Sequence, residues 1–353
     1  MRVLQVDSGR EWRGGQNQVR LLSRELVKRR DIDVRLVTRR GSELARRASA
    51  AGVPVTGVPW LFGPDPLAAF RLARLVGAFQ PAVVHVHDAH ALTVARWALR
   101  WAGSPPLPRR RPLLVATRHV DFHLRPRSLW PSADCIIAVS EAIRRVLLTD
   151  GVPASILRLI PEGVDPEEIR HAAARSLGVR RRLGLPDDAP LAVNVAALVE
   201  HKDQHTLIRA AAAGRALRPD LHWAIAGRGG LRRALERAIR DAGVASHVHL
   251  LGYVEEADAL IQSADVLVMS SKEEGLGTVV LNALALGTPV VATAAGGLVD
   301  VVPAAWRVPV GDAEALARRV VAAVVERPTV ALPDRFTARA MAEDVVALYR
   351  SLL

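Results

Sequence analysis

Residues 270–297 gather the residue types that can hold an anion. Two glutamates, Glu273 and Glu274, precede a glycine-spaced turn and an apolar stretch that we expect to be helical. A tight turn, a β-rich run and a second glycine pair follow. A helix N-terminus presents unpaired N–H groups and the positive end of the helix dipole. We therefore predict that this segment holds a phosphate group together with a polar ring.

The elements that must position this segment alternate along the whole chain. Short apolar runs bounded by chain breakers alternate with amphipathic stretches, which is typical of buried parallel strands in a doubly wound sheet. In the first half we predict strands over 3–6, 34–38, 83–87, 113–117 and 135–139, and helices over 16–30, 42–51, 66–79, 91–101 and 141–148. In the second half we predict strands over 191–196, 222–226, 248–251, 266–269 and 290–292, and helices over 205–217, 231–242, 257–263 and 337–353.

The length of 353 residues favours two domains rather than one. Prolines and charges interrupt the periodicity over 161–182, so we place the boundary there and predict domains over 1–165 and 166–336. The helix over 337–353 is expected to pack back on the first domain. The predicted fold class is α/β, with two facing Rossmann-like doubly wound domains and an inter-domain cleft at the carboxyl ends of their strands.

Composition indicates a globular protein with an uneven charge distribution. Half of the residues are apolar, 24% are charged and the net charge is +12. Residues 1–165 hold 26 Lys or Arg against 14 Asp or Glu, and the remainder is balanced at 22 of each. The excess is either a solvated surface with arginine pairs such as Arg29-Arg30, Arg39-Arg40, Arg46-Arg47 and Arg109-Arg110, or a surface for an anionic membrane or acceptor. Nucleic acid is a weaker interpretation, because only 4% of residues are aromatic and no recognition motif is present.

The sequence favours a cytoplasmic location. Cys135 is the single cysteine, which excludes an intrachain disulfide and fits a reducing compartment. Met1 leads directly into strand-like sequence, so we expect no signal peptide. The uncharged run over 275–299 is long enough to span a membrane, but Gly287 and Pro289 favour a buried helix, turn and strand. Peripheral binding to the inner face of the cytoplasmic membrane is a further option.

Several motifs resemble glycosyltransferase family 4, the retaining nucleotide-sugar glycosyltransferases of GT-B fold, also known as glycosyl transferases group 1. The resemblance covers nearly the whole chain, and it depends on the order and spacing of motifs that are individually weak. In chain order they are Gly14-Gly15 after the first strand, His85-Val86-His87, Ser140 after an apolar strand, Pro161-Glu162-Gly163-Val164-Asp165 where the family has P-N-G-V-D, Lys202, Ala226-Gly227-Arg228-Gly229, Leu251-Gly252-Tyr253-Val254, and the block from Glu274 to Asn282.

The resemblance implies three catalytic residues. Glu274 matches the family glutamate that contacts donor-sugar hydroxyls near the reacting carbon. Lys202 matches the lysine that neutralises the diphosphate leaving group, where a fixed cation helps the transition state more than the ground state. His119 matches a histidine near the sugar and the reaction centre. The alternatives are a surface lysine and a structural histidine.

The resemblance also implies a donor-binding set, made up of Gly15, Arg228, Val254, Gly275, Leu276, Gly277, Thr278 and Asn282. The amides of 276–278 would meet the donor phosphates, unless Thr278 only caps the helix. Arg228 is a possible substitute for the family arginine that is Ala197 here, and the backbone around Val254 would hold the nucleobase. Asn282 stands where the family has a second glutamate for the ribose, so we expect Asn282→Glu to tighten donor binding.

Acceptor-side residues implied by the resemblance are Gly14, Gln16 and His87. A metal site is the alternative for His87, since His85 and His90 lie close in sequence and alternate residues of a strand share a face. We expect no metal and no cofactor, because Lys202 and the helix dipole would replace a cation.

The predicted reaction is the transfer of a sugar from a nucleotide-diphosphate sugar to a hydroxyl acceptor, with retention of configuration. The predicted acceptor is a glycolipid, a lipopolysaccharide-type molecule or another cell-envelope glycan. One alternative is a nucleotide-sugar epimerase of GT-B fold. The other is a sugar-nucleotide binder without turnover, which Ala197 and Asn282 motivate.

Overall fold

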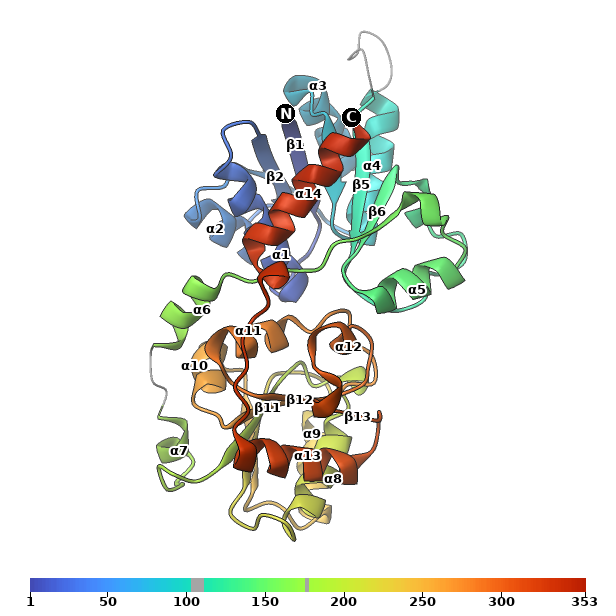
Figure 1. The fold of residues 1–353 in the computed structure, drawn as a ribbon. Coiled ribbons are helices and arrows are strands. Elements are labelled where there is room, and N and C mark those ends of the chain that lie inside the picture. Colours follow the sequence, from blue (N-terminus) through green and yellow to red (C-terminus); the bar gives the residue numbers. More distant parts are fainter. Residues whose placement is uncertain (103–110, 175–177) are drawn as a thin grey trace. The chain divides into compact units, whose positions relative to one another are not determined.

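A computed structural model describes residues 1–102, 111–174 and 178–353, and this chain divides into two compact units (Figure 1). Unit 1 comprises Met1–Gly163 and Arg335–Leu353, and unit 2 comprises Val164–Asp334. The chain therefore leaves unit 1 and returns to it at the C-terminus. Arg109 and Arg110, which belong to one of the predicted arginine pairs, lie outside the described residues.

Unit 1 is built on a parallel sheet whose described strands follow the order β3-β2-β1-β4-β5-β6-β7. The sequence of these strands is rich in valine, leucine and isoleucine, as expected for strands buried on both faces. Strand order reverses between β1 and β4, and ligands of such sheets bind beyond the carboxyl ends at this point. The strands are β1 (Arg2–Asp7), β2 (Asp33–Arg39), β3 (Val55–Val58), β4 (Val83–Val86), β5 (Leu113–Arg118), β6 (Cys135–Ala138) and β7 (Leu157–Leu159).

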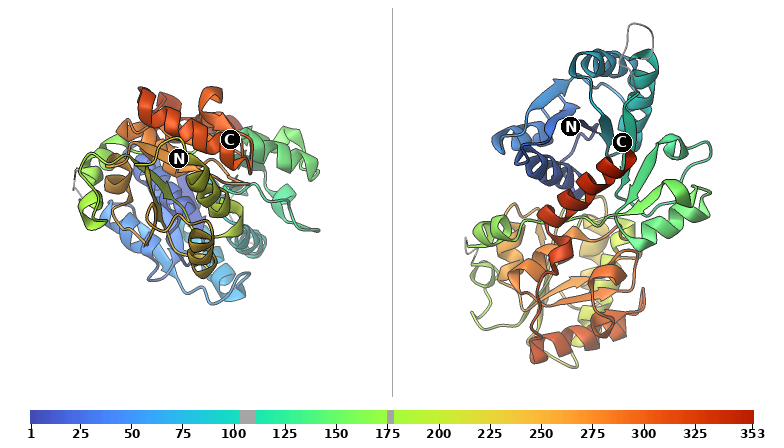
Figure 2. Two further views of the ribbon diagram at one scale, coloured as in Figure 1. Left: turned by 90° about the horizontal axis from the view of Figure 1, so that it is seen from below. Right: turned by 45° about the horizontal axis from the view of Figure 1, so that its top comes forward.

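Helices cover the sheet of unit 1, and the last of them comes from the far end of the chain. The C-terminal helix α14 begins after Thr337, whose hydroxyl accepts the N–H of Ala340 at 3.2 Å, and it packs beside α1 (Figure 2). Its buried Met341, Val345 and Tyr349 recur every four residues and join the core beneath the sheet. The helices are α1 (Gly14–Val27), α2 (Glu43–Ala50), α3 (Pro66–Phe79), α4 (Ala89–Ala102), α5 (Glu141–Thr149) and α14 (Ala338–Leu352).

Unit 2 repeats the architecture with a second parallel sheet in the order β10-β9-β8-β11-β12-β13. Its order reverses between β8 and β11, so the loops after these two strands lie at the point where ligands bind. The strands are β8 (Leu191–Val195), β9 (His222–Ala226), β10 (Val248–Gly252), β11 (Val266–Met269), β12 (Val290–Thr293) and β13 (Arg307–Val308). The predicted doubly wound α/β class is confirmed in both units.

The described helices of unit 2 include four that the sequence prediction missed, and they are α6, α7, α12 and α13. Helix α13 packs on α8 through alanine, valine and leucine side chains, and both helices contribute to the same core. The helices are α6 (Pro166–Ala173), α7 (Val179–Arg182), α8 (Gln204–Gly214), α9 (Arg232–Asp241), α10 (Ala257–Gln262), α11 (Thr278–Leu286), α12 (Leu298–Val301) and α13 (Ala313–Glu326).

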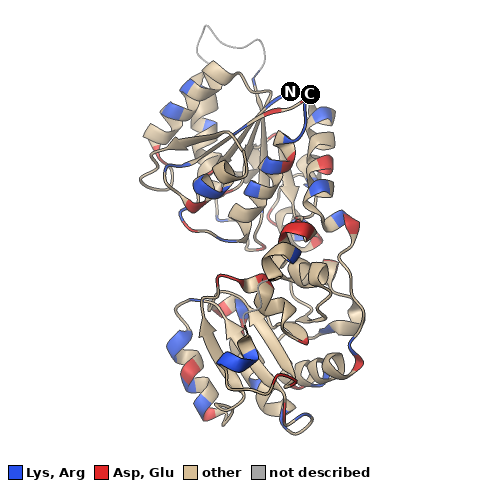
Figure 3. Ribbon diagram, turned by 90° about the vertical axis from the view of Figure 1, so that its left-hand side faces the viewer, with Lys and Arg blue, Asp and Glu red and all other residues tan. Residues whose placement is uncertain are grey.

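Most charged residues lie on helices and loops rather than on strands (Figure 3). Among the residues that the structure describes, no helix combines the length and the apolar character needed to cross a bilayer. The uncharged run over 275–299 is instead α11, β12 and the start of α12, as the sequence favoured.

The loop that follows β1 is held by a buried carboxylate. Asp7 is 1% exposed, and its Oδ1 accepts the N–H of Gly9 at 2.8 Å. The amide of Gln16 donates to Oδ2 at 3.4 Å. Burial, and then the negative charge of Asp88, raise the pKa of Asp7 to about 7, although the two hydrogen bonds favour its charged form. This carboxyl therefore shapes the loop and resists ionisation.

We predict that Asp7→Asn makes stability less dependent on pH. A carboxyl with a raised folded-state pKa stabilises the fold while protonated, and that stability is lost as pH rises from about 4 through about 7. At most about 4 kcal/mol is involved, since one pKa unit corresponds to about 1.4 kcal/mol. The melting temperature of Asp7→Asn relative to the parent should rise between pH 4.5 and pH 8 in thermal unfolding. A difference that stays constant over this range would contradict the prediction.

Candidate functional site

The loops after β8 and β11 meet in a buried ion pair. The ammonium Nζ of Lys202 lies 2.5 Å from Oε2 of Glu274, and their side chains are only 17% and 11% exposed. The hydroxyl of Ser271 donates to the same carboxylate oxygen at 3.3 Å. Burying a charge is costly unless it is paired, so each of these two groups makes the other tolerable in this position. Separate catalytic roles were predicted for the two residues from the sequence, and the fold brings them into contact.

Backbone contacts fix this pair in place. The hydroxyl of Ser270 donates to the carbonyl of Lys202 at 3.0 Å, and the N–H of Gly297 donates to the carbonyl of Glu274 at 2.8 Å. A Cβ on Gly297 would stand 2.1 Å from the carbonyl oxygen of Gly275, so only glycine fits there. The second glycine pair that the sequence displays is thus required for close packing of two loops against each other.

Helix α11 begins with a free N-terminus beside the ion pair. Gly277 adopts a left-handed φ of 82°, and a Cβ there would lie 2.7 Å from Leu298 and 3.4 Å from Cγ of Glu274. No side chain caps the helix in the described structure, and Thr278 is its first helical residue. The alternative role of Thr278 as an N-cap is therefore wrong. The backbone N–H groups at this end, where Leu276 also lies, are available to an anion.

Arg228 and Tyr253 come together at the ends of β9 and β10. The guanidinium of Arg228 lies over the Tyr253 ring, 4.9 Å from its centroid, and the ring is 54% exposed. The carbonyl of Arg228 accepts the N–H of Leu198 at 2.9 Å, which ties this loop to the loop after β8. An exposed aromatic and guanidinium surface suits a planar base or a phosphate. The donor-binding roles of Arg228 and Val254 stay predictions.

Asn282 is already engaged within unit 2. Its amide donates to Oδ1 of Asp258 on α10 at 2.7 Å. Burial raises the pKa of Asp258; the bond from Asn282 opposes this rise, and the charge of Glu168 adds to it. Two acidic side chains, Asp258 and Glu168, therefore already lie near position 282. Asp258 could not be identified from the sequence, since only the packing of α10 on α11 brings it to this position.

In unit 1 the two glycines after β1 start a helix rather than a loop. Helix α1 begins at Gly14, two positions before the predicted start at Gln16. A Cβ on Gly15 would lie 3.9 Å from Cγ of His119, so the first turn of α1 lies against this histidine. The side chain of Gln16 bonds Asp7, which directs its amide toward the end of β1.

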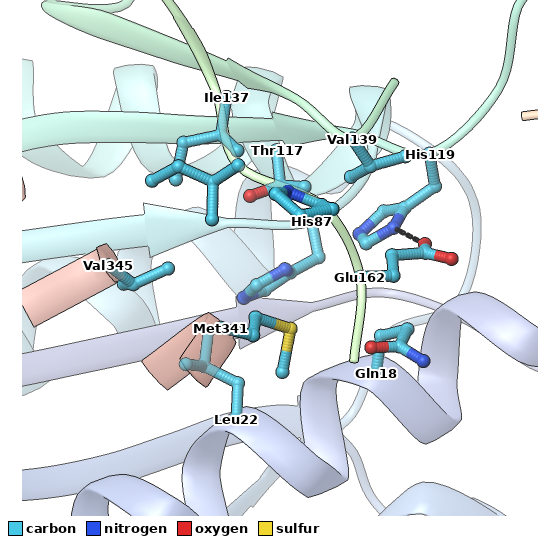
Figure 4. A pocket seen from close by; sticks show the side chains of 12 residues that line it. Gln18, Leu22, His87, Thr117, His119, Ile137, Val139, Glu162, Met341 and Val345 are labelled. Atoms are coloured by element: carbon cyan, nitrogen blue, oxygen red, sulfur yellow. Dashed lines mark hydrogen bonds and ion pairs between the residues drawn. The ribbon is translucent and has the colours of Figure 1, made fainter. Parts of the chain in front are cut away.

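His119, His87 and Gln18 line one pocket of unit 1 (Figure 4). Nδ1 of His119 lies 2.6 Å from Oε1 of Glu162, and Nε2 of His87 lies 2.5 Å from Oε1 of Gln5. Within the described residues, the other ring nitrogen of each histidine and Nε2 of Gln18 are buried without a hydrogen-bond partner. Since buried polar atoms are normally satisfied, these three atoms are the ones that a polar ligand of the pocket would bond.

The protonation of His87 decides which kind of group its free ring nitrogen can bond. Burial lowers the pKa of His87 well below its ordinary value, so the ring is neutral at neutral pH. The carbonyl oxygen of Gln5 can only accept, which places the proton of His87 on Nε2 and leaves Nδ1 as an acceptor. Nδ1 of His119 is held by Glu162, so its Nε2 is the ring nitrogen that faces the pocket. The pocket therefore offers an acceptor on His87 and an amide donor on Gln18.

His85, which the sequence grouped with His87 as a possible metal ligand, has a structural role. Both of its ring nitrogens are bonded, Nδ1 to the hydroxyl of Tyr349 and Nε2 to the hydroxyl of Thr117, each at 2.6 Å. Burial lowers its pKa to about 3. The rings of His85 and His87 lie 4.3 Å apart, as their shared strand face predicts. Over the described residues, no three His, Cys, Asp or Glu side chains are arranged to hold a metal ion.

Two residues of this pocket were not assigned a role from the sequence. Glu162 stands where the family motif has asparagine, and this departure was the signal that could have identified it as the partner of His119. Gln18 gave no signal, because a glutamine on an amphipathic helix is ordinarily solvated. Its carbonyl oxygen accepts the N–H of Gly163 at 3.2 Å, which leaves only its amide nitrogen for the pocket.

Two family models match the chain. The model described as Glycosyltransferase Family 4 matches residues 12–168, and the one described as Glycosyl transferases group 1 matches residues 179–341. Each match lies almost entirely within one of the two units.

Curated relatives carry the names of glycosyltransferases. The chain is 32% identical over 311 residues to the GDP-mannose-dependent alpha-(1-6)-phosphatidylinositol monomannoside mannosyltransferase of Mycolicibacterium smegmatis, covering 82% of this chain and 79% of that protein. It is 30% identical over 290 residues to the putative glycosyltransferase EpsD of Bacillus subtilis, covering 76% and 74%. It is also 35% identical to the lipopolysaccharide core biosynthesis glycosyltransferase LpsE of Rhizobium meliloti, over 40% of this chain and 41% of that protein. These relatives give no support to the epimerase alternative.

Solved structures show the same fold. HepE of Anabaena, in complex with UDP and glucose, matches with a TM-score of 0.80 at 19% identity and covers 99% of this chain and 100% of that one. The lipopolysaccharide outer core galactosyltransferase WaaB matches with a TM-score of 0.74 at 13% identity over the whole of both chains. The two family models, the relatives and the two doubly wound units agree, and the chain belongs to the family 4, group 1 glycosyltransferases of GT-B fold.

Proposed function

We propose that this glycosyltransferase moves a sugar from a nucleotide-diphosphate sugar to a hydroxyl acceptor, with retention of configuration and without a metal ion. The observation that carries the proposal is the buried pair of Lys202 and Glu274 beside the uncapped N-terminus of α11. A diphosphate placed there would meet one fixed cation and several backbone N–H groups. The same position puts Glu274 within reach of hydroxyls on the attached sugar.

The proposed chemistry needs no covalent enzyme intermediate. The acceptor oxygen bonds the anomeric carbon on the face from which the diphosphate departs, as the bond from that carbon to the phosphate oxygen breaks. The proton of the acceptor hydroxyl passes to the departing phosphate oxygen. Negative charge develops on the diphosphate during this step, so Lys202 and the start of α11 stabilise the transition state more than the ground state.

The relatives suggest an acceptor of the cell envelope. The mycobacterial relative is named for a phosphatidylinositol monomannoside acceptor, and another is named for lipopolysaccharide core biosynthesis. We extend this class to the present chain, with a lipid-linked or anionic acceptor at the inner face of the cytoplasmic membrane. The pocket of unit 1, with an acceptor on His87, an amide donor on Gln18 and a second ring nitrogen on His119, supports recognition of a sugar or another polyhydroxyl group.

We predict that Lys202→Ala and Glu274→Ala each lower kcat for sugar transfer by about 100-fold or more, because a preorganised charge is typically worth that much. Lys272 and Glu273 are exposed neighbours that lie outside this ion pair. Their variants Lys272→Ala and Glu273→Ala remove charges of the same sign and serve as matched controls. Transfer of radiolabelled sugar measures the rate, and circular dichroism checks the fold.

The pairing of variants and controls makes the outcome specific. Equal rates for the Lys202 variant and the Lys272 control would remove Lys202 from the mechanism. Calorimetric titration of the parent with nucleotide sugars separates catalysis from binding, since donor binding without any turnover would favour the binder alternative. A thermal-shift screen of nucleotide sugars identifies the donor beforehand, because a ligand of the folded state raises its melting temperature.

We predict that Asn282→Glu lowers the free energy of unfolding and does not tighten donor binding. This is the reverse of the expectation from the sequence. A third carboxylate would meet Asp258 at hydrogen-bond distance, with Glu168 nearby, and would cost about 1–3 kcal/mol of unfolding free energy at pH 7. Urea unfolding measures this cost. The double variant Asn282→Glu with Asp258→Asn restores one amide and one carboxylate, and it should recover most of the loss. Tighter donor binding in the single variant would show that the original expectation holds.

We predict that a chelator leaves the transfer rate unchanged within twofold, because Lys202 and α11 replace a cation at the diphosphate. The measurement compares transfer in excess EDTA with transfer in added Mg²⁺ and Mn²⁺. A loss of activity in EDTA that either ion restores would refute the metal-independent mechanism.

A further inference from the structure

A fully buried tyrosine of the C-terminal helix reaches the polar groups near the pocket of unit 1. Tyr349 on α14 is 0% exposed, and its hydroxyl contacts two strand residues that lie side by side, Gln5 on β1 and His85 on β4. The amide Nε2 of Gln5 donates to this oxygen at 3.0 Å, and Nδ1 of His85 lies 2.6 Å from it. Removing polar groups from water is costly unless each is hydrogen-bonded, and an apolar side chain would avoid that cost. The buried hydroxyl therefore indicates a role other than packing.

The contacts of Tyr349 belong to a longer series of hydrogen bonds. At one end, Nε2 of His85 lies 2.6 Å from Oγ1 of Thr117 on β5. At the other end, Oε1 of Gln5 lies 2.5 Å from Nε2 of His87. We call the set of Thr117, His85, Tyr349, Gln5 and His87 the polar chain. None of the five is more than 6% exposed, and the two end members, Thr117 and His87, line the pocket (Figure 4).

The hydrogen bonds of the polar chain all run in one direction. Burial lowers the pKa of His85 to about 3 and the pKa of His87 well below its ordinary value, so each ring is neutral and carries one proton. The hydroxyl of Tyr349 accepts the amide of Gln5, so its own proton goes to Nδ1 of His85. The ring proton of His85 then donates from Nε2 to Thr117. On the other side, the carbonyl oxygen of Gln5 accepts the proton on Nε2 of His87, which leaves Nδ1 of His87 as an acceptor in the pocket.

The opposite direction would give the pocket the opposite character. If the amide of Gln5 turned over, its Nε2 would donate to His87 and its carbonyl oxygen would accept the proton of Tyr349. Each further bond of the polar chain would then reverse as well. Nδ1 of His87 would carry the ring proton, and the pocket would present a donor in place of an acceptor. A change at Tyr349 or at Thr117 therefore alters His87 through the bonds between them.

We propose that Tyr349 is a positioning residue that fixes His87 as a hydrogen-bond acceptor in the pocket. A ligand hydroxyl can donate to Nδ1 of His87 and accept from the amide of Gln18, whereas two donors would leave the proton of that hydroxyl without a partner. The polar chain thus favours a ligand that donates at His87. The use of this acceptor for a substrate hydroxyl rests on the proposed function, whereas the position of the proton on His87 does not.

The position of the ring proton can be measured without donor or acceptor. Long-range nitrogen–proton NMR correlations at pH 7 distinguish a histidine protonated at Nε2 from one protonated at Nδ1, and the signal of His87 is identified by its loss in His87→Gln. The parent should carry the proton on Nε2. In Tyr349→Phe the amide of Gln5 loses its acceptor, and a buried N–H without a partner is tolerated less well than a buried C=O. The amide should therefore turn over, donate to His87 and move the ring proton to Nδ1.

Thr117 provides an independent test at the other end of the polar chain, which decides the matter even if Tyr349→Phe does not fold. Thr117→Val keeps the shape of the side chain but removes the acceptor of His85, so the bonds should reverse and the proton of His87 should again move to Nδ1. Thr117→Ser keeps a hydroxyl and should keep the proton on Nε2. Leu348→Ala truncates a buried side chain of α14 outside the polar chain, so it controls for a loosened core and should also keep the proton on Nε2.

The kinetic consequence is measured in the sugar-transfer assay. Tyr349→Phe should raise the KM of one of the two substrates about tenfold, because one hydrogen bond of the bound hydroxyl is lost, while kcat changes by less than about threefold. A proton on Nδ1 of His87 in the parent, or an unchanged proton position in Tyr349→Phe, would overturn the proposal. A moved proton with both KM values unchanged would also overturn it, since Tyr349 would then serve the core alone. If the parent transfers no sugar, the proposed function fails, and the NMR measurement still decides the state of His87.

Discussion

The constraint on which the rest depends is that the central strands of both parallel sheets, such as β4 and β11, are buried on both faces. Such strands cannot present free polar groups along their length, and the few polar residues within them must be satisfied internally. Gln5 and His85 do so through Tyr349, and Asn194 donates to the carbonyl of Val268 at 2.8 Å. Polar chemistry is therefore confined to the loops at the carboxyl ends, and the reversals of strand order decide which of these loops meet a ligand.

Each unit places an ionisable side chain beside a carboxylate, close to the start of a helix. Unit 2 pairs Lys202 with Glu274 near Gly277, which precedes a helix, and unit 1 pairs His119 with Glu162 near Gly15, at the start of another. A carboxylate partner keeps a cationic or protonatable group tolerable in a largely buried position before any anion arrives. The carboxylate partner also reduces the free energy that is gained when an anion binds, because the existing ion pair must first be weakened. In the proposed donor site this arrangement would favour a strongly charged group such as a diphosphate, since a weak anion could not compete with Glu274 for the ammonium of Lys202.

Much of the fold could be predicted from the sequence, since apolar runs of four to six residues between amphipathic stretches leave few alternatives to a doubly wound sheet. The prediction missed β3, β7 and β13 among the strands and α6, α7, α12 and α13 among the helices. Helix α6 has a clear start signal in Asp165 and Pro166, but the prolines and charges around it were interpreted as a domain boundary. Other missed elements have little contrast with their surroundings. Strands β7 and β13 span three and two residues, and α13 mixes alanine and valine over most of its surface. The identities of Lys202, Glu274 and His119 came from a family resemblance, whereas their partners depend on tertiary packing. Asp258 illustrates the limit, because nothing in its local sequence points to Asn282 24 residues later.

Charge along the chain is a poor guide to charge on the surface. The arginine pairs that stand out in the sequence are partly balanced within the fold, since Glu43 bonds both Arg46 and Arg47, and these bonds lower the pKa of its carboxyl to about 2. Asp31 similarly pairs with Arg350 at the other end of the chain. The arginines of α3 and α4 are separated by three or four residues and form no conspicuous run, yet helical spacing brings them onto one side without acids. Helix periodicity, rather than spacing along the chain, therefore decides which positive charges share one side of the fold, and a count over any linear stretch averages this grouping away.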